Sequence, residues 1–134
     1  MLCYRGGMID QLLGHQNYQL AKQLLDAASL RHEALATNIA NLETPGFKRL
    51  DLSPDFARQL EKLAASGPTA EPIQLRPTVV EDPNARAVRP DGNSVELDRE
   101  LIEMNRNSLE YEFLTQFASD SIKRLKTAIT GRIA

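Results

Sequence analysis

Proline is confined to one part of the chain, and this limits the folds that the sequence can adopt. Pro45 precedes a group of six prolines that all fall between residues 54 and 90, whereas residues 8–44 and 91–134 contain none. A proline in a helix interior removes a backbone hydrogen bond and clashes with the preceding turn. The distribution therefore predicts two long helices near the chain ends, separated by an irregular middle segment.

The first proline-free arm carries apolar residues at helical spacing. Steps of four or seven residues connect Leu20, Leu24, Ala28, Leu35 and Ile39. This is the period of an amphipathic helix. We expect residues 8–44 to hold an N-terminal helix followed by a turn.

The end of that helix and the turn after it are predicted by local chemistry. Asn41 is expected to stop the helix, because asparagine tolerates the left-handed conformation. The run Thr-Pro-Gly-Phe at 44–47 is typical of a type II turn, in which proline fixes φ and the following Gly46 takes a positive φ.

The second arm carries an unbroken heptad pattern. Its a and d positions are Leu97, Leu101, Met104, Ser108, Tyr111, Thr115, Ala118, Ile122, Leu125 and Ile129. Alternating steps of four and three are typical of helices that supercoil around a partner. Asn93 followed by Glu96 predicts an N-cap with a capping box, so residues 93–134 are expected to form one long helix.

The middle segment, residues 45–92, is predicted to be an irregular insert. Residues 55–65 carry apolar side chains at helical spacing and predict a short helix, capped by Asp51 or Ser53. Residues 73–80 alternate in part and predict one or two short strands, limited by two prolines. The expected fold class is mainly α, with the two long helices paired as a coiled-coil-like hairpin.

Such a hairpin would leave apolar rows uncovered, because pairing buries only one stripe of each helix. Either other chains cover these rows, or residues 55–65 close a small three-helix bundle. In the first case the assembly interface is expected to comprise Leu20, Leu24, Leu35, Ile39, Leu97, Leu101, Met104, Tyr111, Ala118, Ile122, Leu125 and Ile129.

Composition disfavours several other classes of protein. The 134 residues carry 16 Lys and Arg against 18 Asp and Glu, so no net charge draws the chain to nucleic acid or an anionic membrane. The single Cys3 excludes an intramolecular disulfide, and His15 and His32 are too far apart for a metal pair on one helix. We expect no transmembrane helix and no cleavable secretory signal.

Acidic residues close in sequence raise the question of a catalytic acid pair. Asp98, Glu100 and Glu103 are expected on a solvated helix face, and Asp51 and Asp55 in a loop. No pattern around them predicts a pocket that would tune a general acid and base. We therefore expect no enzyme, no catalytic residue, no metal, no cofactor and no small-molecule substrate.

The junction between the first arm and the middle carries the most specific motif. Asn-Ile-Ala-Asn at 38–41 followed by Thr-Pro-Gly-Phe at 44–47 resembles the signature of bacterial flagellar rod, hook and hook-associated axial proteins. The residues that carry it are Asn38, Asn41, Thr44, Pro45, Gly46 and Phe47. Within this family, the short chain and the run Gly-Asn-Ser-Val-Glu-Leu-Asp-Arg-Glu at 92–100 are similar to a proximal rod protein. Its sibling FlgC, similar in size and in the N-terminal signature, is an alternative.

The resemblance implies a structural role. Such subunits polymerise through both terminal helices, and the proximal ones form the base of the drive shaft that transmits torque. The partners implied are further copies, other rod subunits such as FlgC and FlgF-like proteins, the adaptor FliE and the inner-membrane ring protein FliF. The motif region is implied to contact neighbouring subunits.

The resemblance also implies a route and a place. Members are exported unfolded through the flagellar type III apparatus, without a cleaved signal peptide, to the periplasmic part of the basal body. Residues 1–7 depart from the family pattern and look like an extension ahead of a more family-like start at Met8. A standalone helical adaptor that binds a partner helix is the alternative from a different functional class.

Overall fold

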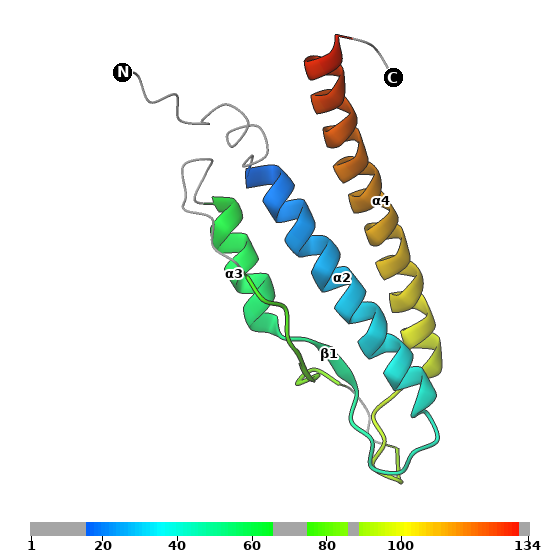
Figure 1. Cartoon of the computed structure of the whole chain (residues 1–134). Helices are drawn as coiled ribbons and strands as arrows, with labels where there is room; N and C mark the ends of the chain where they lie inside the picture. The colour runs from blue at the N-terminus through cyan, green and yellow to red at the C-terminus, as the bar shows by residue number, and fades with distance from the viewer. Residues whose placement is uncertain (1–15, 66–74, 86–88, 132–134) are drawn as a thin grey trace.

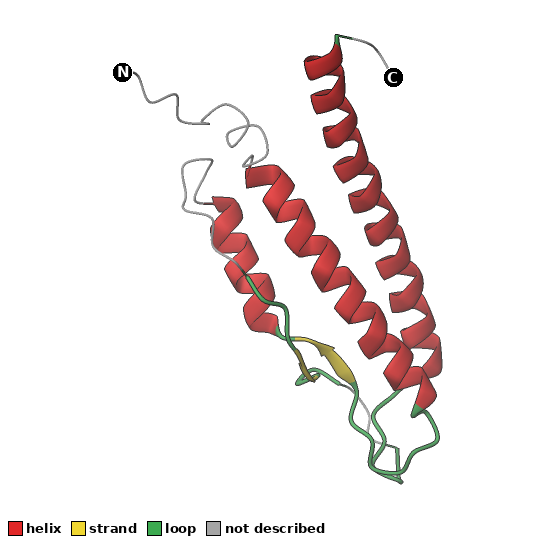
Figure 2. Ribbon diagram, viewed as in Figure 1, coloured by secondary structure: helices red, strands yellow, loops and turns green. Residues whose placement is uncertain are grey.

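The structure is a computed structural model that describes residues 16–65, 75–85 and 89–131. Its elements, in chain order, are α2 (Gln16–Ala40), β1 (Leu50–Leu52), α3 (Pro54–Ala65), β2 (Val79–Glu81) and α4 (Leu97–Thr130). In Figure 1, α2 lies between α3 and α4 and runs antiparallel to both. The strands and loops of the insert gather around one end of the helices (Figure 2). The predicted fold class, mainly α with a short insert, is confirmed.

Helix α2 ends where the sequence indicates. Its last residue is Ala40, and the Asn41 amide still donates to the Thr37 carbonyl at 3.1 Å. In the turn that follows, the Phe47 amide donates to the Thr44 carbonyl at 3.3 Å and Gly46 has φ of 74°. Both the helix end and the type II turn are confirmed. Residues 8–15 of the predicted arm, like residues 1–7, lie outside the described residues.

Helix α4 begins later than predicted. Glu96 occupies the N-cap position with no side-chain cap hydrogen bond, and the first helical residue is Leu97. The predicted capping box is therefore wrong, because the Asn93 side chain is buried and bonds elsewhere. At the other end, Gly131 has φ of 63° and its amide donates to the Thr127 carbonyl, a left-handed helix stop.

The insert contains the predicted short helix. Pro54 starts α3, where its missing N–H would have no partner in any case. Of the two predicted caps, Ser53 is the one used, since its Oγ accepts from the Asp55 amide at 3.3 Å.

The structure describes residues 75–80 of the predicted strand region, and β2 begins there at Val79. Its antiparallel partner β1, paired through Asp51 and Val80, was not predicted.

The apolar core is small and lies between α2 and α3. Ala27, Phe56, Leu63 and Leu75 form it, and Leu20, Leu52 and Leu60 pack against it. Helix α3 lies on the side of α2 away from α4 (Figure 1), so the described residues do not form a closed three-helix bundle. None of the described helices combines the length and apolar content needed to cross a membrane.

The two long helices do pair, but the heptad stripe of α4 is not what faces α2. The buried residues of α4 are Glu100 and Asn107, and the Asn107 carboxamide donates to the Ala28 carbonyl of α2 at 2.8 Å. The heptad residues Leu97 and Leu101 are exposed. The fully buried residues of α4 are therefore polar, and the apolar residues of the heptad stripe are half-buried or exposed.

Candidate functional site

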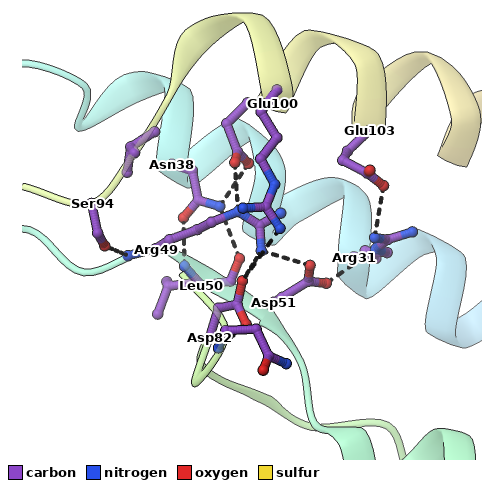
Figure 3. Close-up of polar contacts among 12 residues, drawn as sticks. Arg31, Asn38, Arg49, Leu50, Asp51, Asp82, Ser94, Glu100 and Glu103 are labelled. Carbon is purple, nitrogen blue, oxygen red and sulfur yellow. Dashed lines mark hydrogen bonds and ion pairs between the residues drawn. The ribbon is translucent and has the colours of Figure 1, made fainter. Parts of the chain in front are cut away.

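Polar side chains fill the junction between α2, β1 and the start of α4 (Figure 3). We call this set the junction cluster, and it comprises Asn38, Arg49, Asp51, Asp82, Ser94 and Glu100. Asn38 comes from the last turns of α2, Arg49 and Asp51 from the strand region after the motif turn, and Glu100 from the first turn of α4. The cluster thus joins segments that are far apart in sequence.

Arg49 is the centre of the junction cluster. Its side chain is only 2% exposed, and its Nε donates to Glu100 Oε1 at 2.6 Å. Its Nη1 donates to Asp51 Oδ2 at 2.8 Å and to Asp82 Oδ2 at 2.7 Å. Burial by itself would lower the pKa of Arg49, but the hydrogen bonds to Asp51 and Glu100 outweigh it and raise that pKa. One guanidinium therefore bonds to carboxylates from three segments of the chain.

Asn38, the first residue of the motif, uses its carboxamide as a backbone substitute. Its Oδ1 accepts from the Leu50 amide at 2.8 Å, and its Nδ2 donates to the Leu50 carbonyl at 2.8 Å. The same Nδ2 donates to Glu100 Oε2 at 2.9 Å. Asn38 is completely buried, so these bonds satisfy groups that water does not reach. The residue fixes β1 against both long helices.

A second arginine extends the junction cluster along α4. Arg31 lies 3.1 Å from Asp51 through its Nε and 3.0 Å from Glu103 through its Nη2. Burial alone would raise the pKa of Asp51, but the hydrogen bonds from Arg31, Arg49 and the Leu52 amide hold it below its usual range. Asp51 is therefore kept ionised between two guanidinium groups.

The free energy of unfolding is expected to fall in acid because of Asp51. Its pKa is lower in the folded than in the unfolded chain, so its charged form contributes stability above the unfolded value of about 3.9. That contribution is lost as the pH falls through the folded pKa. Urea unfolding of the wild type and Asp51→Asn, between about pH 7 and pH 2, measures the effect. The variant should lose less stability on acidification than the wild type, and equal losses would contradict the assignment.

Asn93 closes the far end of the hairpin. Its Nδ2 lies 3.0 Å from the carbonyls of Asn41 and Leu42 and 2.8 Å from that of Thr44. Its Oδ1 accepts from the Val95 amide at 2.8 Å. Carbonyls at a helix C-terminus lack partners within the helix. Asn93, in the segment that leads into α4, supplies a hydrogen-bond donor to these carbonyls.

Two turns meet at this end through their glycines. The Gly46 amide donates to the Asp91 carbonyl at 2.9 Å, and Gly92 has φ of 82°. A Cβ on Gly92 would lie 3.4 Å from the Gly46 Cα. The motif turn and the turn before α4 therefore lie backbone against backbone, and a larger residue at Gly92 would strain the contact as well as the dihedral.

The structure brings the motif residues together at this end of the hairpin but gives them different environments. Asn38 is buried in the junction cluster, and Asn41 and Phe47 are half-buried. Thr44, Pro45 and Gly46 are exposed on the turn. Exposed turn residues remain free to contact other molecules, whereas Asn38 acts within the subunit.

The predicted interface residues are distributed between the interior and the surface. Leu35 is fully buried inside the subunit, and Leu20 packs against the core. The half-buried residues are Leu24, Ile39, Met104, Ala118 and Leu125. The exposed ones are Leu97, Leu101, Tyr111, Ile122 and Ile129. Their contact with other chains stays a prediction.

Sequence reasoning missed the ionic residues of the junction. Glu100 and Glu103 were expected on a solvated face, and this is wrong: Glu100 is completely buried and the Glu103 side chain is only 19% exposed. Glu100 and Asn107 are separated by seven residues, a helical period that becomes visible when polar residues are included. The carboxylates are held by arginines, and no group of metal-ligating side chains in the described residues is placed to hold a metal ion.

The surface of α4 is unusually apolar. Nine of the ten large hydrophobic residues that are exposed in the described part of the chain lie on this helix. They are Leu97, Leu101, Ile102, Leu109, Tyr111, Phe113, Phe117, Ile122 and Ile129. Extended apolar surface of this kind marks a contact with another protein or a membrane.

The chain is similar to flagellar rod proteins over nearly its whole length. It is 31% identical over 138 residues to the flagellar basal body rod protein FlgB of Escherichia coli (strain K12), covering 91% of this chain and 97% of that protein. FlgB of Buchnera aphidicola subsp. Acyrthosiphon pisum (strain APS) is 30% identical over 132 residues, with 87% and 96% covered. FlgB of Aeromonas hydrophila is 33% identical over 134 residues, with 91% and 95% covered. No protein-family model matches the chain.

Proposed function

Because the chain belongs to the FlgB family of flagellar basal body rod proteins, we propose that it is a structural subunit that polymerises as the base of the drive shaft and transmits torque. The observation that carries this proposal is the exposed apolar surface of α4. Its relatives are named FlgB, which favours this role over that of the sibling FlgC.

The arrangement of the helices supports association with other chains. Helix α2 covers one side of α4, and α3 lies on the far side of α2. The outer sides of α4 therefore have no neighbour among the described residues (Figure 1). Burying apolar area contributes about 25 cal/mol per Å². Packing several copies around these sides would therefore stabilise an assembly at little conformational cost, because α4 is already helical.

The proposal extends to the partners and the route. We propose association with other rod subunits, FlgC and FlgF-like proteins, and with the adaptor FliE and the ring protein FliF at the rod base. Export would proceed through the flagellar type III apparatus to the periplasmic part of the basal body, without a cleaved signal peptide. A role in torque transmission needs packed helices and no catalysis, so we propose that the protein is not an enzyme.

Deletion of the gene in its source organism tests the function directly. We expect loss of swimming, and basal bodies with an intact inner-membrane ring but no rod above it. Complementation with the full chain, and with a chain that starts at Met8, should restore both and would show that residues 1–7 are dispensable. A complete rod and normal swimming in the deletion strain would overturn the proposal in favour of a helical adaptor.

A further inference from the structure

We propose that copies of this chain associate head to tail, with a ridge on α4 of one copy seated in a groove between α3 and α4 of the next. The ridge consists of Ile102, Leu109, Phe113 and Phe117. This inference rests on the proposed function, since it specifies which surfaces meet when the subunits polymerise.

The groove is an open hollow of about 420 Å³ with an apolar floor. Leu24, Ala27 and Ala28 of α2 form the floor, Phe56 and Leu60 of α3 line one wall, and Leu114 of α4 lines the other. The two alanines keep the floor low, so a helix laid along the groove can approach α2 closely.

The ridge is apolar and is not covered by any of the residues that the structure describes. Its residues are exposed, Phe113 by 70% and Leu109 by 67%. They follow one another at steps of seven, four and four, which places them on one side of α4. At 100° per residue that side is turned away from Glu100 and Asn107, the residues that face α2. One copy can therefore offer its ridge and its groove at the same time.

A pair of opposite charges fits this arrangement. Arg106 lies on the ridge side of α4, with its side chain 69% exposed. Glu110 lines the groove, and the two arginines that also line it, Arg31 and Arg99, contact carboxylates within the subunit. A ridge seated in the groove brings Arg106 of one copy toward Glu110 of another.

The two surfaces are different, and this determines the form of the assembly. A contact between unlike surfaces leaves a free ridge at one end and a free groove at the other. Repetition of such a contact produces a ring if the rotation closes and an open helical filament if it does not. The inferred contact is therefore suited to building a tube.

Cysteine cross-linking between copies tests the inference. In a Cys3→Ala background, one full-length protein carries Ala57→Cys in the groove wall and another carries Phe113→Cys on the ridge. Treating the mixture with a short bis-maleimide should give several-fold more cross-linked dimer than treating either protein alone. Glu112→Cys is the matched control, because it is exposed and adjacent to Phe113 but lies about 100° around the helix.

Two results would overturn the inference. Equal cross-linking of Glu112→Cys and Phe113→Cys to the groove would show no preference for the ridge, and efficient cross-linking of Phe113→Cys with itself would show a ridge-to-ridge contact. Electron microscopy of the same samples distinguishes a failure of the inferred contact from a failure of the proposed function. Polymers without the cross-link would contradict only the inferred contact, whereas chains that never associate, alone or with rod proteins, would contradict both.

Discussion

Replacing Arg49 with alanine is expected to lower the free energy of unfolding by about 3–5 kcal/mol. The guanidinium is almost completely buried and contacts Glu100, Asp51 and Asp82. Removing it leaves Glu100 as a buried charge with its ionic partner gone, which is far more costly than losing an exposed pair. Since domains of this size are stable by about 5–15 kcal/mol, a large part of that stability would disappear. Urea unfolding followed by circular dichroism measures the change.

Two further variants control the Arg49 experiment. Arg106→Ala removes an arginine that is mainly in solvent and should change the free energy of unfolding by only about 0.5 kcal/mol. Adding Glu100→Leu to Arg49→Ala removes the stranded carboxylate and should recover part of the loss. If Arg49→Ala destabilises the protein no more than Arg106→Ala, the junction cluster does not hold the fold together.

Introducing aspartate into the heptad stripe is expected to abolish rod assembly. Leu101 and Ile122 are 45% and 53% exposed, so Leu101→Asp or Ile122→Asp should change the stability of the isolated subunit by only about 0.5 kcal/mol. In an assembled interface the same carboxylate would be buried without a partner. Swimming and rod formation should therefore be lost although the purified variant is folded.

The matched control is Asn105→Asp, which adds the same charge at an exposed position of α4 outside the stripe. Basal bodies from complemented deletion strains show the rod, and circular dichroism of the purified chains shows the fold. Asn105→Asp should support swimming. Normal rods with both Leu101→Asp and Ile122→Asp would remove the heptad stripe from the interface.

Features of the fold that depend on neighbouring residues could be predicted from the sequence. The turn at 44–47 follows from the conformations of Pro45 and Gly46, and α3 and α4 follow from apolar periodicity. Strand β1 could not be found in this way, because Leu50–Leu52 is too short to show a pattern and pairs with residues about thirty positions later. The pairing is supported by Asn38, whose carboxamide bonds the backbone amide and carbonyl of Leu50.

The candidate site was less predictable than the fold. Arg49 and Glu100 are 51 residues apart, and nothing local distinguishes a carboxylate that will be buried from one that stays in water. Asn93 was misassigned because a carboxamide has both an acceptor oxygen, which can cap a helix start, and a donor nitrogen, which here binds carbonyls at the end of α2. The heptad pattern identified α4 as a helix but not the direction in which its stripe would face.

The contact made by Asn93 has a mechanical consequence. One carboxamide holds the last carbonyls after α2 through its nitrogen and the amide of Val95, just ahead of α4, through its oxygen. A twist or pull applied to one long helix can therefore pass to the other through Asn93, in addition to the direct contacts that Asn38 and Asn107 make between the helices. The part of the insert outside the junction cluster is bypassed by these links, so its length can vary without breaking them.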